Sequence, residues 1–209
     1  MNTLNEQQLD SLASIVRFGA TDASRALSSW LGRPVRVSME RLEQVSLEIA
    51  TELLGPADAT VCACCLRVVG GMNGQLLLGF DDVSGWMLCD ALLSRETKSF
   101  EWGELEESAA METSNIVGCA FLNALAQIFP RSGQAASGSE DTAWIPTPPV
   151  FVRDFAAAIM QFALIDQATE FDTVLIAQTQ FTIDGTPVGW SLLLVPDAES
   201  LDRLARTLT

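Results

Sequence analysis

The spacing of apolar residues near the start of the chain predicts a long amphipathic helix. Six apolar or small residues recur there at steps of three and four positions, which places them on one helical face: Leu12, Val16, Gly19, Ala23, Leu27 and Trp30. We expect this helix over residues 4–31, because the Gly32-Arg33-Pro34 segment that follows contains two helix-ending residue types.

The pattern from residue 34 to 94 predicts a short strand, a short helix, a β-hairpin and another helix. The expected ranges are 34–39 for the strand, 47–54 for the short helix, 61–69 and 75–80 for the hairpin, and 82–94 for the last helix. Glycines and Asn73 between the two hairpin segments are typical of tight turns. Asp81 and Asp82 stand where a carboxylate can cap the helix that follows.

The second half of the chain repeats this order of elements. The segment 132–149 is rich in Gly, Ser and Pro, and we interpret it as a long inserted loop. Around it we expect helices over 104–129 and 155–164, strands over 171–183 and 187–195, and a final helix over 197–208.

Two pairs of similar segments indicate an internal duplication. ALSSWLGR at 26–33 aligns with ALAQIFPR at 124–131, and LLLGFDD at 76–82 aligns with LLLVPDA at 192–198. We interpret the chain as one domain over 1–209, built from pseudo-repeats 4–97 and 98–209. The predicted class is α+β, with a mixed or antiparallel sheet of about six strands and helices on one or both faces. Neither half would fold alone, because each would leave a sheet face bare.

Composition removes several classes of function. Apolar residues make up 48% of the chain and its mean hydropathy is +0.25, which is unlike a disordered protein. The formal net charge is −15 and the one lysine is Lys98, which argues against nucleic-acid binding. The chain has no histidine, so it cannot use imidazole catalysis. We expect no membrane span and no signal peptide. The acidic balance of the chain favours a cytoplasmic protein.

The cysteines favour reduced thiols over a disulfide framework, because their number is odd and three of them cluster within four residues: Cys62, Cys64, Cys65, Cys89 and Cys119. On a strand, Cys62 and Cys64 would face one side and Cys65 the other. No second cysteine pair or histidine completes a set of four ligands, so we expect no metal site in this chain.

Polar residues on the expected helix 104–129 share a narrow stripe, because helical spacing brings them onto one face: Ser108, Glu112, Asn115, Cys119 and Asn123. Glu112 and Asn115 are one turn apart and can reach the same external group. A carboxylate can pair with a cation, and a carboxamide can hold a water by donating and accepting at once. A polar stripe of this kind is also what an ordinary solvated helix face contains.

The pattern Ser108-x-x-x-Glu112-x-x-Asn115, followed by Ile116-Val-Gly-Cys-Ala-Phe-Leu-Asn-Ala-Leu125, resembles the signature helix of the CheC/CheX/FliY family of bacterial chemotaxis phosphatases. The first helix, with its continuation to residue 38, also looks like the opening helix of CheC. The resemblance covers residues 9 to 205 and implies an internally duplicated CheC-like fold.

The resemblance also implies an activity, namely hydrolysis of the phosphoaspartate of a CheY-like response regulator. The partner would supply the phosphorylated Asp, the Mg²⁺ and a Lys, so no cofactor is expected in this chain. Glu112 would pair with the partner's Lys, Asn115 would position the attacking water, and Ser108 would support them. Positioning and charge stabilisation are the usual means of accelerating phosphoryl transfer.

Two departures from the family pattern stand out. At the equivalent positions of the first helix, Ser14 and Arg17 replace the Glu and Asn, so we predict one active site and a degenerate second one. The proline expected after the motif is Gly138 here, and an insertion around 133–142 would displace it to Pro148-Pro149. The segment 150–160 then looks like the family's second-half helix.

An alternative remains open from the sequence. A chain with one degenerate helix could act as a catalytically weak adaptor or scaffold of a chemotaxis or two-component circuit. CheC relatives bind the receptor deamidase CheD, and the equivalent region here is roughly 154–165.

Overall fold

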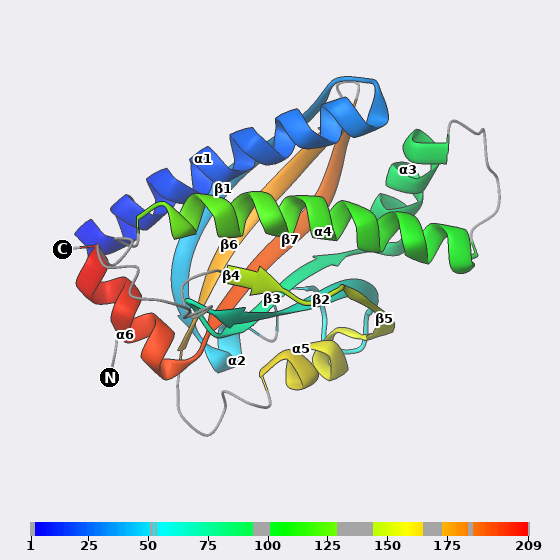
Figure 1. Cartoon of the computed structure of the whole chain (residues 1–209). Helices are drawn as coiled ribbons and strands as arrows, with labels where there is room; N and C mark the ends of the chain where they lie inside the picture. Colours follow the sequence, from blue (N-terminus) through cyan, green and yellow to red (C-terminus); the bar gives the residue numbers. More distant parts are fainter. Residues whose placement is uncertain are drawn as a thin grey trace.

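Seven strands of the described chain form one antiparallel sheet, which lies between helices on its two faces (Figure 1). This computed structural model describes residues 3–50, 52, 54–93, 101–128, 144–164, 173–183 and 186–208. The elements are, in chain order, α1 (Glu6–Leu31), β1 (Val35–Ser46), α2 (Leu47–Ala50), β2 (Thr60–Gly70), β3 (Gly74–Phe80), α3 (Asp82–Leu93), α4 (Glu104–Ala126), β4 (Trp144–Pro146), β5 (Val150–Phe155), α5 (Ala156–Leu164), β6 (Thr173–Ile183), β7 (Thr186–Pro196) and α6 (Ala198–Thr207).

The two halves of the chain interleave within this sheet. The strand order is β1-β6-β7-β3-β2-β4, with β5 also paired to β2. The first strand of the first half, β1, therefore pairs with β6 of the second half, and β5 pairs with β2 in return. The central pair, β3 and β7, joins Leu76 to Leu194 and Leu78 to Leu192. Each half completes the sheet of the other, which confirms the predicted α+β class.

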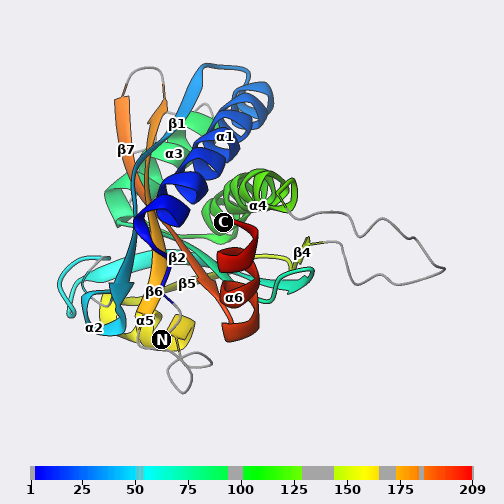
Figure 2. The ribbon, with the colours of Figure 1, turned by 90° about the vertical axis from the view of Figure 1, so that its left-hand side faces the viewer.

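Different residues cover the two faces of the sheet. On one face the core comes from α1, α3, α4 and α6; on the other it comes from α2 and α5 (Figure 2). Strand β2 divides its cysteines as its period of two predicts, because Cys62 and Cys64 face the first core and Cys65 faces the second. All five cysteines are free thiols.

Helices α1 and α4 lie side by side as the outer layer on the first face and run in opposite directions (Figure 1). They meet at Gly19, where an added Cβ would lie 3.0 Å from Phe121 Cδ1 and 3.1 Å from Phe121 Cα. Helix α4 also approaches the sheet closely, because a Cβ on Gly118 would lie 2.9 Å from Leu76 Cδ2. Because glycine has no side chain, Gly19 and Gly118 let α4 approach α1 and the sheet closely.

The loops before α3 and α6 make equivalent contacts 116 residues apart. The Asp81 carboxylate accepts from the backbone N–H of Ser84, and Asp197 does the same for Ser200. The Ser84 hydroxyl accepts from the N–H of Gly189, at 3.2 Å between the heavy atoms.

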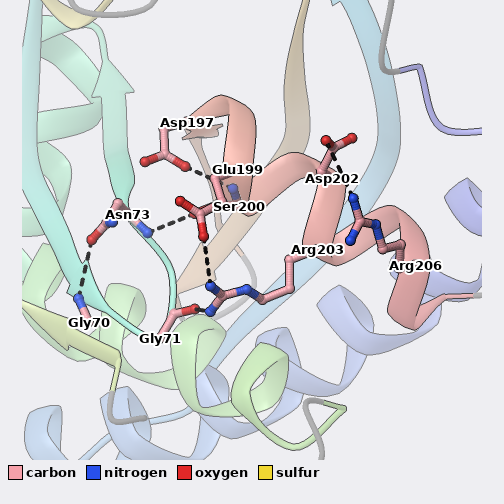
Figure 3. Close-up of polar contacts among 9 residues, drawn as sticks. All are labelled: Gly70, Gly71, Asn73, Asp197, Glu199, Ser200, Asp202, Arg203 and Arg206. Atoms are coloured by element: carbon pink, nitrogen blue, oxygen red, sulfur yellow. Dashed lines mark hydrogen bonds and ion pairs between the residues drawn. The ribbon is translucent and has the colours of Figure 1, made fainter. Parts of the chain in front are cut away.

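The Ser200 hydroxyl makes the corresponding bond with the backbone N–H of Asn73, at 2.9 Å (Figure 3). Figure 3 also shows Arg203 donating to the carbonyl of Gly71, so α6 is fixed to the β2–β3 turn. These matching bonds support the interpretation of a duplicated chain, whose repeat boundaries stay a prediction.

Three segments show the main differences from the sequence prediction. Strand β1 extends to Ser46 instead of ending at Met39, because β6 pairs with it over its whole length, with a bulge between Met39 and Arg41. The segment 150–155 is strand β5, and the helix expected there begins only at Ala156. Part of the expected loop 132–149 is strand β4, which pairs with residues 68–70 of β2, beyond the reach of β5. Residues 132–143 of that loop lie outside the described chain.

Candidate functional site

The beginning of α4 is anchored by Trp102, which lies two residues before the helix starts at Glu104. The Trp102 indole Nε1 donates to Asp82 Oδ1 at 2.8 Å. Its ring packs 4.8 Å from the ring of Phe151 and 5.9 Å from that of Phe80, between centroids. Helix α3 closes over this ring at Gly85, where an added Cβ would lie 2.6 Å from Trp102 Cη2. The first turn of α4 is therefore held against the sheet.

Asp82 connects this anchor to the edge strand β5. Arg153 donates to it twice, from Nε to Oδ1 at 2.9 Å and from Nη2 to Oδ2 at 2.7 Å. These bonds from Arg153, ahead of those from Trp102 and Cys62, hold the pKa of Asp82 below its ordinary value. The sequence predicts Asp82 only as a helix cap, and no local signal in it identifies Arg153 as a partner.

The polar stripe of α4 faces away from the core. Ser108 and Glu112 are exposed, whereas Asn115 is half-buried. The opposite face of the helix is packed against the sheet and α1, since Ala110 and Val117 have no exposed surface. The carboxylate and the carboxamide therefore lie one turn apart on the accessible side of the same helix.

Cys119 belongs to the same stripe, one turn beyond Asn115. Its thiol donates to Asn115 Oδ1, with 3.7 Å between the sulfur and the oxygen. Burial, and then the negative charge of Glu112, raise the pKa of the Cys119 thiol. Glu112, Asn115 and Cys119 thus form one electrostatically connected group on α4.

Neighbouring polar residues of α4 do not contribute to this group. Thr113 and Ser114 are fully buried, and their hydroxyls donate to the carbonyls of Ala109 and Ala110 one turn earlier. Their hydrogen bonds are satisfied within the helix, so they serve packing.

Helix α1 presents a different set at the equivalent positions. Ser14 and Arg17 are both exposed, and the Ser14 hydroxyl donates to the carbonyl of Asp10. Phe18, next to them, is 49% exposed. Arg17 carries only donors, so it cannot by itself hold a water by donating and accepting as the Asn115 carboxamide can.

The remaining cysteines have the properties of core residues. Burial is the main cause of a raised pKa at Cys62, Cys64 and Cys65, reaching about 12 for Cys64 and about 11 for Cys65. Such thiols stay protonated at neutral pH and are poor nucleophiles. Among the described residues, no three Cys, Asp or Glu side chains are grouped as a metal site would need. In the same part of the chain, no helix is long and apolar enough to cross a membrane.

Comparison with known proteins finds one curated relative of low identity. No family model matches the chain. CheC of Bacillus subtilis (strain 168), described as a CheY-P phosphatase, is 25% identical over 130 residues. The match spans 61% of this chain and 62% of the length of CheC.

Solved structures match over nearly the whole chain. FliY of Thermotoga maritima has a TM-score of 0.76 at 15% identity, covering 99% of this chain and 98% of that one. The FliM middle domain of H. pylori has a TM-score of 0.69 at 14% identity, covering 98% and 99%. CheX, in a complex with CheY, BeF3 and Mg²⁺ from Borrelia burgdorferi, has a TM-score of 0.51 at 12% identity, covering 87% and 99%.

These likenesses define the class of the protein. The chain has a CheC/CheX/FliY-like fold, shared with proteins of bacterial chemotaxis. This confirms the resemblance drawn from the α4 motif and the first helix.

Proposed function

We propose that this chain is a phosphatase that removes the phosphoryl group from the aspartyl phosphate of a CheY-like response regulator. The observation that carries the proposal is the pairing of Glu112 and Asn115 on the accessible face of α4, one turn apart. The description of CheC as a CheY-P phosphatase, and the complex of CheX with CheY, support the class of substrate.

Glu112 would contribute charge. An exposed carboxylate at the second turn of the stripe can form an ion pair with a lysine that a receiver domain brings to the interface. That pair would orient the receiver on α4. It would also be desolvated on docking, so its geometry would matter more than that of an ordinary surface pair.

Asn115 would hold the attacking water. Its carboxamide offers two donors and an acceptor oxygen, which can fix a water in line with the phosphorus without covalent chemistry. Ser108, one turn before Glu112 and exposed, would support the docking surface. The Mg²⁺ that balances the phosphoryl charge would be held by the receiver and not by this chain. The reaction would take place in the cytoplasm.

Phosphate release from a phosphorylated CheY-like receiver tests the proposal. Glu112→Ala and Asn115→Ala should each lower the rate about 10²-fold, because each removes a positioned group. Glu104→Ala and Gln127→Ala change an exposed carboxylate and an exposed carboxamide at the two ends of the same helix, and should leave the rate unchanged. Wild-type rates in both Glu112→Ala and Asn115→Ala would refute the enzymatic proposal.

A binding role is the second candidate, and exposed aromatic residues favour it. Phe155 at the end of β5 is 54% exposed and Phe162 on α5 is 59% exposed, within the region first suggested for a CheD-like partner. Capture of a CheD-like deamidase that survives Asn115→Ala but is lost in Phe162→Ser would support an adaptor. If neither the wild type nor Asn115→Ala captures the deamidase while phosphatase activity is intact, the phosphatase proposal stands and the adaptor role does not.

A further inference from the structure

The hydrogen bond between Cys119 and Asn115 links two neighbouring residues of the outward-facing stripe of α4. Side chains of a helix lean toward its N-terminus, so Cys119 leans over the preceding turn, where Asn115 lies. The sulfur is 3.7 Å from Asn115 Oδ1 and Cys119 is only half-exposed. The thiol is thus directed onto the side chain of Asn115.

The thiol is a donor under ordinary conditions. Its pKa is raised by burial and by the charge of Glu112, so the S–H is retained at neutral pH. An asparagine carboxamide turns easily about χ2, whose energy profile is broad and two-fold. Without a partner, Asn115 would present its oxygen and its nitrogen to a water in either order.

We infer that Cys119 is a positioning residue for Asn115: its thiol binds Oδ1 and so directs the Nδ2 donors away from the helix end, toward the turn that carries Glu112. The inference rests on the proposed function of Asn115. It gives the half-buried cysteine a role beyond packing, because a donor at this position fixes which way the amide points. A hydrogen bond donated by a thiol is weak, so the expected effect on the rate of phosphate release is modest.

Kinetics of phosphate release separate orientation from packing. Cys119→Val fills similar space without a donor and should lower kcat roughly fivefold with KM unchanged, because the receiver still docks on α4. Cys119→Ser keeps a hydroxyl donor and should retain most of the wild-type kcat. Cys119→Ala serves as a second donor-free variant should valine disturb folding. Equal rates in the serine and the two donor-free variants, or a change confined to KM, would overturn the inference.

A double-mutant cycle tests whether Cys119 acts through Asn115. In an Asn115→Ala background, Cys119→Val should produce no further loss, because the group it orients is gone. An additional fivefold loss there would show that Cys119 acts by another route.

A readout independent of catalysis keeps the two proposals separate. The side-chain amide resonances of Asn115 in NMR spectra should shift and broaden in Cys119→Val, and remain near wild type in Cys119→Ser. Unchanged resonances in all variants would overturn the positioning role even with an active enzyme. A wild-type rate in Asn115→Ala would instead remove the proposed role of Asn115, and the catalytic meaning of this hydrogen bond with it.

Discussion

The Asp82 carboxylate offers the sharpest test of how α4 is held. It accepts from Trp102 at the beginning of α4, twice from Arg153 on β5, and from the Cys62 thiol at 3.4 Å. Asp82 is also the first residue of α3, where a negative charge is favourable. Replacing it therefore affects the sheet edge and two helices at once.

The expected loss for Asp82→Ala follows from these contacts. The Trp102 N–H, partly buried, would lose its acceptor, at about 1–3 kcal/mol. The Arg153 side chain is 43% exposed, so its ion pair adds only about 0.2–1 kcal/mol. Loss of the charge at the first turn of α3 adds about 0.3–1 kcal/mol. Together, these losses should make Asp82→Ala lower the free energy of unfolding by about 1.5–5 kcal/mol.

Asp82→Asn is the matched control. The amide oxygen can still accept from Trp102, so this variant should lose only about 1 kcal/mol. Urea unfolding followed by far-UV circular dichroism measures both values without depending on the changed surroundings of Trp102. A loss below about 0.5 kcal/mol in Asp82→Ala would refute the account of this anchor.

Acid conditions give a second check on Asp82. Its pKa is lowered in the folded state, mainly by Arg153, so its stabilising contribution is complete above the ordinary Asp pKa of about 3.9. The contribution is lost as the pH falls through the lower folded-state pKa. The difference in stability between the wild type and Asp82→Asn should therefore shrink below pH ~4. A difference that stays constant down to the pH of acid unfolding would contradict this reasoning.

Two further outcomes concern α1 and the packing around Trp102. Adding Ser14→Glu and Arg17→Asn to a Glu112→Ala variant should raise phosphate release about tenfold above Glu112→Ala alone, because it restores the paired groups on α1. No increase would show that the surroundings of α1 do not support a second site. Gly85→Ala should destabilise the fold by about 1–2 kcal/mol in urea unfolding, because the new Cβ meets the Trp102 ring. The gain in helix propensity offsets only part of this clash. A stabilised protein would contradict the close approach of α3 to Trp102.

Elements whose apolar residues recur at a regular spacing, or whose strands are joined by a recognisable turn, could be predicted from the sequence. Helix α1 was expected over 4–31 and spans Glu6–Leu31, and α4 was expected over 104–129 and spans Glu104–Ala126. The hairpin of β2 and β3 was predicted from turn glycines between two apolar runs. In each case the period of the apolar residues, or a turn sequence, is a local property of the chain.

The edge strands were not predictable in the same way. Strand β4 has three residues and includes a proline, and β5 has six residues with little alternation of burial. Both exist because β2 offers them unpaired backbone groups from far away in the sequence. A segment that becomes a strand through a distant partner carries no period of its own.

The sequence by itself determined that Ser108, Glu112 and Asn115 share one stripe, because 3.6 residues per turn places them there whatever surrounds the helix. Only the tertiary structure shows how closely the other faces of α4 pack, against α1 at Gly19 and against the sheet at Gly118. It also decided that Asp82 meets Arg153, 71 residues away, because each half of the chain completes the sheet of the other. Periodicity is a local property of a chain, whereas contacts between its halves exist only once both have folded together.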